Sequence, residues 1–249
     1  MLKEERQRTI LNEVELHNRV LLTDIAEKLD VSIDTVRRDV KELDIDNRLR
    51  KVHGGAVSLG FANYSPVRNN IYALEQKTLI AKKALGLIES NSVILIDGGT
   101  TCLELARMIP PEMALTCFTL SLPVAQELLR KPKVKTIFIG GLLSKDAQIS
   151  IGPNTIHQLS GIMVDYSFIG TGYVDVQFGL TEFDWDIVQT KKAVIKASKK
   201  SVLLSIAEKL NSQHRFKICD IHDIDTLVTE LEPESKLLDN FRKHDINLL

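Results

Sequence analysis

The spacing of apolar residues near the N-terminus predicts a short helix with one buried side. Val36, Val40 and Leu43 recur at positions i, i+4 and i+7, and Ser32 stands just before them as a possible N-cap. At about 100° per residue, the opposite face carries charged side chains, Asp34, Arg38 and Lys41. The pattern therefore predicts an amphipathic helix with a narrow, largely cationic outer face.

Two further helices are predicted upstream. The spacing of Ile10, Leu11 and Val14 indicates a longer first helix, and residues 24–29 form a short second one with Thr23 as its cap. Only two residues separate the second helix from Ser32. A connection this short is typical of a helix-turn-helix, in which one helix braces the recognition helix across the DNA groove.

A basic hairpin is predicted directly downstream. Residues 49–57 contain two short strand-like runs around Gly54-Gly55, which is a hairpin signal. A cationic hairpin beside a recognition helix forms a wing that contacts phosphates or the adjacent minor groove. On the helix, the residues predicted to contact the major groove are Thr35, Arg37, Arg38 and Lys41, and Ser32 is predicted to cap the helix and touch a phosphate. In the wing, the residues predicted to contact the flanking DNA backbone are Arg50, Lys51 and His53. The alternative is an ordinary amphipathic helix with a solvated charged face.

The rest of the chain alternates buried-type strands with amphipathic helices. Strands are predicted at 93–97, 115–119, 136–139, 166–169 and 201–205, and helices at 74–89, 102–108, 122–131, 154–159 and 186–199. This alternation predicts a doubly wound, mostly parallel α/β domain, so the whole chain is of the α/β class. We expect a winged helix-turn-helix DNA-binding domain at 1–57, a linker at 58–72, and an effector-sensing domain at 73–249.

Three glycine-bearing loops follow predicted strands and indicate a ligand site. The first is Asp97-Gly98-Gly99-Thr100-Thr101, where glycine amides and a helix N-terminus can hold an anion and Asp97 can accept hydrogen bonds from sugar hydroxyls. The others contain Gly140-Gly141 and Gly170. Because ligands of such sheets bind at the carboxyl ends of strands, the loops predict one crevice for a phosphate-bearing ligand. Plain tight turns are the alternative, since the first loop lacks the Walker lysine and a G-x-G-x-x-G frame.

Composition and charge narrow the possible functions. Of 249 residues, 44% are hydrophobic and 26% charged, which suits two folded domains. Residues 1–57 hold 11 Lys and Arg against 12 Asp and Glu, a formal charge of −1, so we expect modest non-specific DNA affinity and reliance on dimerisation and specific contacts. Three cysteines without paired spacing predict reduced thiols, and the histidines show no metal-ligand spacing, so no metal or cofactor is expected.

Neither a signal peptide nor a membrane span is expected. The N-terminal residues lack an apolar core, and no apolar run approaches the ~20 residues of a membrane helix. We therefore expect the cytoplasm.

The chain resembles the DeoR family of bacterial transcription regulators over nearly its whole length. The N-terminal match comprises Arg6, Ile10-Leu11, Val31-Ser32, Thr35 to Asp39 and Arg50 to Ala56. The C-terminal match comprises Lys77, Ile80-Ala81, Asp97 to Thr101, Gly140-Gly141, Gly152, Phe168 to Gly170, Gly179 to Thr181 and Ile224 to Thr229. The resemblance implies a DNA reader joined to a sensor of small phosphorylated metabolites, usually sugar phosphates. That sensor is similar in fold to ribose-5-phosphate isomerase and glucosamine-6-phosphate deaminase.

The resemblance also implies three more effector residues, Thr119, Ser121 and Lys209. Lys77 and Lys191 could likewise neutralise a phosphate, but Lys209 matches the family's sensor lysine. Two positions depart from the family pattern: Leu120 stands where an Asn is usual, and Ile206 replaces an Asp three residues before Lys209. Each lost hydrogen-bonding group would leave a polar ligand atom unpaired at ~1–3 kcal/mol, which indicates an altered, less polar or more weakly bound effector.

These observations predict a transcription regulator, a repressor of a sugar or related metabolic operon, that binds operator DNA as a homodimer or homotetramer. The alternative is an isomerase or deaminase of sugar phosphates with a DNA-binding head. Such an enzyme needs a positioned base, and Asp97 is the one clear candidate in the predicted crevice. We therefore expect no enzymatic activity and no catalytic residue. A structural DNA-binding protein without a ligand is disfavoured by the size and loop chemistry of the second domain.

Overall fold

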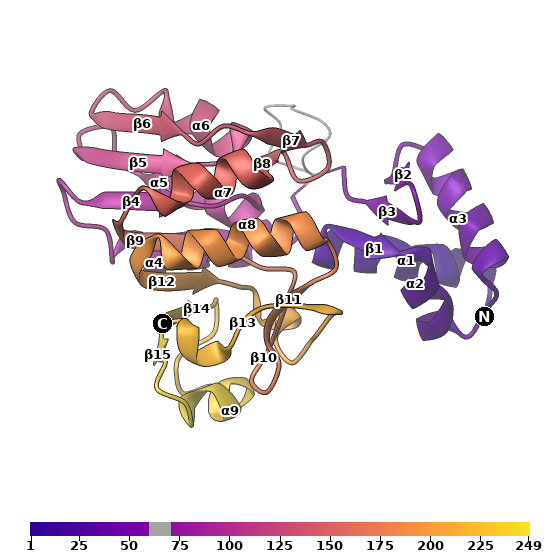
Figure 1. Cartoon of the computed structure of the whole chain (residues 1–249). Helices are drawn as coiled ribbons and strands as arrows, with labels where there is room; N and C mark the ends of the chain where they lie inside the picture. The colour runs from indigo at the N-terminus through magenta and orange to yellow at the C-terminus, as the bar shows by residue number, and fades with distance from the viewer. Residues whose placement is uncertain (60–70) are drawn as a thin grey trace. The chain divides into compact units, whose positions relative to one another are not determined.

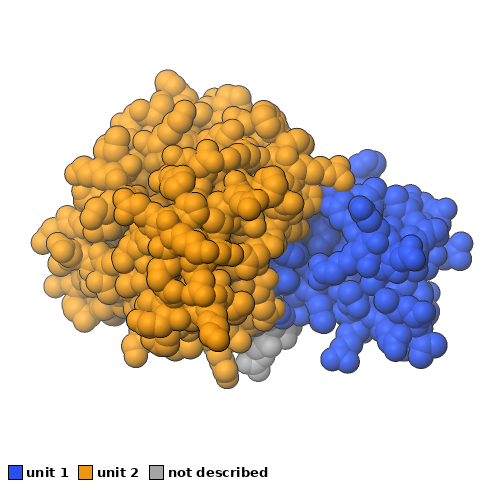
Figure 2. All heavy atoms as spheres, turned by 90° about the horizontal axis from the view of Figure 1, so that it is seen from below, with its two compact units in different colours: residues 1–72 blue, residues 73–249 orange. Residues whose placement is uncertain are grey.

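The computed structural model describes residues 1–59 and 71–249, which divide into two compact units. Unit 1 spans residues 1–72 and unit 2 spans residues 73–249, coloured separately in Figure 2. Most of the predicted linker 58–72 falls on residues 60–70, outside the described residues. Figure 1 labels the helices and strands of both units.

Unit 1 contains three helices and a small antiparallel sheet of order β1-β3-β2. Its elements are α1 (Lys3–His17), β1 (Arg19–Leu21), α2 (Leu22–Leu29), α3 (Ile33–Ile45), β2 (Arg50–Val52) and β3 (Gly55–Val57). The three predicted helices and the predicted hairpin are all present. The apolar faces of α1, α2 and α3 bury a common core with β1 and β3. Strand β1 was not predicted because three residues carry no periodic signal.

Two local predictions in unit 1 are wrong. Helix α2 begins at Leu22, and the residue before it, Leu21, offers no side-chain cap. Thr23 lies inside the first turn, where its hydroxyl bonds to Asp24, so it does not cap this helix. In the wing, Val52 pairs with Gly55, so the two turn residues are His53 and Gly54 rather than Gly54 and Gly55. Gly54 has φ +71°, a left-handed backbone conformation that residues with a side chain rarely adopt.

Unit 2 is built on a seven-stranded sheet of order β15-β14-β12-β9-β4-β5-β6, in which every neighbouring pair is parallel. The strands are β4 (Val93–Ile96), β5 (Leu115–Thr119), β6 (Val134–Phe138), β9 (Val164–Gly170), β12 (Ser198–Leu204), β14 (Thr226–Val228) and β15 (Asn247–Leu248). The five predicted strands are the five longest of these. Strands β14 and β15 were not predicted, since three and two residues are too few to show an apolar run.

Helices cover both faces of this sheet, as a doubly wound fold requires (Figure 1). The helices are α4 (Leu74–Leu85), α5 (Thr100–Met108), α6 (Leu122–Leu128), α7 (Pro153–Ser160), α8 (Trp185–Lys196) and a short α9 (Asp239–Arg242). Helix α5 contacts α4 and α6, whereas α7 contacts α8. The predicted doubly wound parallel architecture is confirmed.

The chain reverses its direction of travel across the sheet between β4 and β9. From β4 it continues to β5 and β6 on one side, whereas β9 leads to β12, β14 and β15 on the other. The chain segments that leave the carboxyl ends of β4 and β9 therefore run in opposite directions across the sheet, which makes this position a topological switch point, where such folds bind ligands.

Two smaller sheets, neither of them predicted, supplement the main one. They are the hairpin of β7 (Leu142–Ser144) with β8 (Ile149–Ile151), and the sheet of β10 (Tyr173–Asp175), β11 (Gly179–Glu182) and β13 (Phe216–Cys219).

Candidate functional site

Helix α3 presents the predicted recognition surface. Val36, Val40 and Leu43 are fully buried, which holds the opposite side of the helix outward. The Ser32 hydroxyl accepts the Thr35 backbone N–H at 3.2 Å and lies 2.9 Å from the Thr35 hydroxyl, so Ser32 is the predicted N-cap. Of the eight predicted DNA-contacting residues, Thr35 is half-buried. The other seven are exposed: Ser32, Arg37, Arg38, Lys41, Arg50, Lys51 and His53. All eight are available to a ligand.

A buried ion pair fixes α3 against α1. Arg6 donates from Nε to Asp39 Oδ2 at 2.6 Å and from Nη2 to Asp39 Oδ1 at 3.1 Å, a two-pronged geometry that sets both position and rotation. Asp39 is 2% exposed. The hydrogen bond to Asp39 raises the pKa of Arg6 above its ordinary value. Sequence reasoning did not assign this role, because the partners lie 33 residues apart.

The cations on the outer face of α3 differ in how free they are. Arg37 is paired with Asp34 one turn earlier on the same helix. Across residues 1–59 and 71–249, Arg38 and Lys41 form no ion pair with another side chain. The wing is tied to the end of α3, since the Lys51 backbone N–H donates to Asp44 Oδ1 at 2.9 Å. Of the three cations on this face of α3, Arg38 and Lys41 are therefore the two whose charge is not already paired, and they are the best candidates for contacts with DNA.

In unit 2, the loops after β4 and β9 meet at the switch point. Asp97 directly follows β4 and is fully buried, and its backbone N–H donates to Phe168 O of β9 at 2.9 Å. A Cβ on Gly170 would lie 3.0 Å from Gly98 O, and a Cβ on Gly98 would lie 2.4 Å from the Ile149 side chain. The absence of a side chain at Gly170 therefore permits the two loops to approach each other, and its absence at Gly98 leaves room for Ile149 of β8.

Four ionisable side chains are buried around these loops. Lys191 of α8 places Nζ 2.6 Å from Asp97 Oδ2 and 2.5 Å from Gly170 O. Lys209 donates to Thr171 O at 3.0 Å, and Glu182 accepts the Phe183 backbone N–H at 2.9 Å. Asp97 is fully buried, and the other three are each 7% exposed. Several buried charges around the carboxyl ends of β4 and β9 mark this cluster as a functional-site candidate.

The buried charges shift one another's pKa values. Burial disfavours the charged form of Lys191, but Asp97 outweighs this through its charge and hydrogen bond and raises the pKa of Lys191. Burial lowers the pKa of Lys209 to about 8, although the charge of Glu182 opposes that effect. Burial likewise raises the pKa of Glu182. Near neutral pH, Lys191 is firmly cationic, whereas Lys209 lies close to its titration point.

The predicted hydroxyl residues lie beside the Asp97 loop. Thr119 donates to Ile96 O at 2.7 Å and accepts the Ser121 N–H at 3.1 Å, and Ser121 accepts the Val124 N–H at the start of α6. Both side chains are buried. A Cβ on Gly98 would lie 3.9 Å from Ser121 Cβ, so this segment borders the cluster. Leu120 between them packs into the apolar core.

The structure sets Gly140 and Gly141 in a different environment. Gly140 O accepts from Thr155 Oγ1 at 3.1 Å and from Gln158 Nε2 at 2.9 Å, and a Cβ on Gly141 would lie 2.1 Å from Thr155 Oγ1. These contacts tie the loop to α7 and give the glycines a packing role. A role in effector binding stays a prediction for them.

The sequence indicated Lys191 as a possible phosphate partner but favoured Lys209 over it, and it did not indicate Glu182. A signal for Lys191 was present, because it occupies the buried stripe of α8 with Ile187, Val188 and Val194, where a cation needs a partner. Glu182 ends the short strand β11 and carries no comparable signal. Glu182 also adds a second buried carboxylate to Asp97, which the sequence indicated as the one candidate base.

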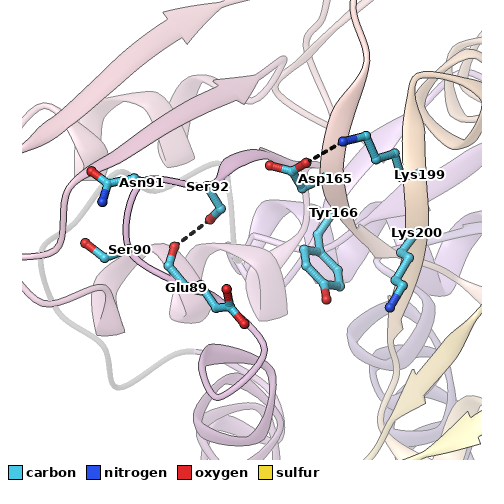
Figure 3. Close-up of a pocket in the computed structure, with 8 residues that line it drawn as sticks. All are labelled: Glu89, Ser90, Asn91, Ser92, Asp165, Tyr166, Lys199 and Lys200. Carbon is cyan, nitrogen blue, oxygen red and sulfur yellow. Dashed lines mark hydrogen bonds and ion pairs between the residues drawn. The ribbon is translucent and has the colours of Figure 1, made fainter.

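A separate polar hollow lies at the opposite, amino ends of β4, β9 and β12 (Figure 3). Lys199 points to Asp165, with Nζ 2.9 Å from Oδ1, and the Lys200 ammonium lies 5.7 Å from the Tyr166 ring centroid. These cations are already engaged, and none of the predicted effector residues lines the hollow.

Three further observations concern the cysteines, possible metal ligands and membrane-spanning helices. Cys102, Cys117 and Cys219 are free thiols; the first two are buried and Cys219 is half-buried. Within residues 1–59 and 71–249, no group of three or more potential ligands could hold a metal ion. The same residues contain no helix with the length and apolarity needed to cross a membrane.

Comparison with protein families matches both parts of the chain. A DeoR-like helix-turn-helix domain matches residues 6–60, and a DeoR C terminal sensor domain matches residues 73–231. An uncharacterised HTH-type transcriptional regulator of Haemophilus influenzae is 32% identical over 92% of this chain and 90% of its own length. The glycerol-3-phosphate regulon repressor of Escherichia coli is 29% identical and covers 100% of this chain and 99% of its own.

Among solved structures, ribose 5-phosphate isomerase A of Methanocaldococcus jannaschii is similar with a TM-score of 0.42 and 18% identity. The similarity covers 56% of this chain and 55% of that one.

Proposed function

The chain belongs to the DeoR family of transcription regulators, and from this we infer that it is a repressor whose DNA binding is controlled by a small phosphorylated sugar. A helix-turn-helix joined to a sensor domain supports operator DNA and a small-molecule effector as its partners. Relatives named for glycerol-3-phosphate and L-fucose operons support a sugar-related pathway. We propose functional boundaries at 1–57, 58–72 and 73–249.

The observation that best supports DNA binding is the exposed cationic face of α3, whose opposite side is packed into the core of unit 1. Arg38 and Lys41 project opposite the buried stripe, and the Arg6–Asp39 pair sets the rotation of the helix. A guanidinium on such a face can donate two hydrogen bonds to guanine O6 and N7. We propose that α3 enters the major groove while the wing, through Arg50, Lys51 and His53, contacts the flanking backbone.

For the sensor, we propose that the phosphorylated effector binds at the carboxyl ends of β4 and β9. The supporting features are the glycines at 98, 99 and 170, the N-terminus of α5 at Thr100, and the ammonium of Lys209. Thr101, Thr119 and Ser121 complete the proposed site. Coupling to DNA requires that the effector bind the DNA-competent and DNA-incompetent states with different affinity.

We propose a homodimer or homotetramer as the DNA-binding form. One winged helix reads a short half-site, and a twofold partner supplies the second half. The formal charge of −1 on residues 1–57 supports this, because weak electrostatic attraction favours a second set of specific contacts.

An enzymatic role is less well supported by the site. A general base takes a proton from its substrate, and one of the two oxygens of Asp97, Oδ2, is already bound by the Lys191 ammonium. Glu182 is a second buried carboxylate of the cluster, and its raised pKa is compatible with a base. Incubation with aldose and ketose phosphates tests this: turnover that Glu182→Gln or Asp97→Asn abolishes would replace our proposal.

Selection of bound sequences from a random DNA pool, followed by fluorescence polarisation with the selected duplex, tests the proposed function. We expect a twofold-symmetric site, and we expect at least one of a panel of phosphorylated sugars to weaken binding. Arg38→Ala should abolish binding, while Arg130→Ala, a similarly exposed arginine of unit 2, should not. No sequence preference in the selected pool would contradict a role as a specific regulator.

A further inference from the structure

The Asp97–Lys191 pair has hydrogen-bonding capacity that the protein itself does not use. Asp97 Oδ2 receives the Lys191 ammonium at 2.6 Å, whereas Oδ1 is buried and has no hydrogen-bond partner among residues 1–59 and 71–249. An ammonium has three N–H donors, and those of Lys191 go to Asp97 and to Gly170 O, which accounts for two. One acceptor on Asp97 and one donor on Lys191 therefore remain within the same ion pair.

A buried carboxylate oxygen without a partner is costly, which indicates that something else occupies this position in the working protein. Asp97 is fully buried at the switch point, directly before Gly98, whose carbonyl oxygen lies close to Gly170 of the β9 loop. The vacant acceptor is therefore part of the proposed effector site rather than of the hydrophobic core.

The chemistry of the two vacant positions restricts the group that can fill them. An ionised phosphate or a carbonyl has no hydrogen to donate to Asp97 Oδ1, and phosphate would be repelled by the carboxylate. An ammonium group could donate to Asp97 but would be repelled by Lys191. A hydroxyl both donates and accepts, so one hydroxyl oxygen can satisfy Asp97 Oδ1 and the third Lys191 N–H together.

We infer that the Asp97–Lys191 pair reads a hydroxyl group of the effector, separately from the groups that hold its phosphate. This inference rests on the proposed function and makes it more specific: the effector is a polyhydroxylated phosphate ester, and Lys191 determines specificity. The phosphate is bound by the Gly98–Thr101 segment and Lys209, so charge recognition and hydroxyl recognition come from different residues.

Matched ligands that differ in hydroxyl content test the inference on the full-length protein by calorimetry. The pairs are sn-glycerol 3-phosphate with n-propyl phosphate, and glucose 6-phosphate with n-hexyl phosphate. For a pair whose polyol member binds, we expect the alkyl member to bind about tenfold more weakly or worse, since it leaves two buried charged groups unsatisfied. Equal affinities within the pair would overturn the inference while leaving a phosphorylated effector in place.

Variants assign the discrimination to the pair. Asp97→Asn should reduce the polyol-to-alkyl ratio to about threefold or less, because an amide bonded to Lys191 through its oxygen presents N–H instead of an acceptor. Lys209→Met should weaken both ligands and preserve the ratio, and Lys199→Met, from the exposed Lys199–Asp165 pair, should change neither affinity.

The outcomes distinguish failure of the proposed function from failure of this inference. If no phosphate ester binds, the proposed function and this inference both fail. If Asp97→Asn does not fold, the wild-type ratio alone decides, since a buried water satisfying the pair in place of the ligand would give equal affinities.

Discussion

Replacing Lys191 by methionine should destabilise unit 2 strongly, because it leaves Asp97 buried and charged without its partner. Asp97 is 0% exposed, and its Oδ1 has no hydrogen-bond partner among the described residues. Loss of Lys191 would therefore also remove the ion pair made by Asp97 Oδ2. Breaking a buried ion pair from one side costs about 3–5 kcal/mol. Since a folded domain is stable by only about 5–15 kcal/mol, this is a large share of the total.

Urea unfolding followed by tryptophan fluorescence measures this loss directly. Trp185 is the single tryptophan in the chain and lies at the start of α8 in unit 2, so its signal reports the unit that carries the substitution. At about 2–4 °C per kcal/mol for a domain of this size, the melting temperature should fall by about 6–20 °C. The double variant Asp97→Asn with Lys191→Met removes both charges and should recover much of the stability.

Lys199→Met is a matched control from the same unit. Its ammonium also lies close to an aspartate, 2.9 Å from Asp165 Oδ1, but the lysine side chain is 64% exposed. Water already solvates such a pair, so its loss should cost about 1 kcal/mol or less. If Lys191→Met proved no more destabilising than Lys199→Met, the pair would not be the buried, mutually dependent contact described above.

Four further outcomes are expected. Arg38→Ala should lower operator affinity at least a hundredfold without an appreciable change in melting temperature, since the side chain is exposed; equal affinity in a polarisation titration would exclude it from the interface. Asp39→Ala should lower both the melting temperature and operator affinity, whereas Glu42→Ala, which breaks an exposed α1–α3 ion pair, should barely change the melting temperature. Because the pKa of Lys209 is about 8, affinity for a phosphorylated effector should fall as pH rises from 7 to 9, and Lys209→Met should remove that dependence. The same lowered pKa of Lys209 means that the unfolded chain binds more protons than the folded chain between about pH 8 and 10.5. Lys209 by itself therefore raises the free energy of unfolding of unit 2 as pH rises through that window. If the free energy of unfolding of the wild type did not increase relative to that of Lys209→Met, the assignment would be contradicted.

Local patterns were sufficient where a single element carries its own signal. Ser32 with the stripe Val36, Val40 and Leu43 predicted the start and the buried face of α3, because both depend on residues within three turns. The buried strands of unit 2 were predicted for a similar reason, since each contains a short stretch rich in apolar residues. The glycine loops after β4 and β9 were recognised as a candidate site because the ends of parallel strands share one edge of the sheet.

The partners of the buried charges could be known only from the tertiary structure. Asp97 and Lys191 are 94 residues apart, and Arg6 and Asp39 are 33 apart. No local periodicity encodes such pairs, because they depend on the order of strands in the sheet and on the rotation of each helix against its neighbours. The same dependence separated Gly140 and Gly141, which pack on α7, from Gly98 and Gly170, which meet at the switch point. The sequence by itself determined which segments fold and which residues carry charge. Packing decided which of those charges face one another and which oxygen of Asp97 is left without a hydrogen-bond partner among the described residues.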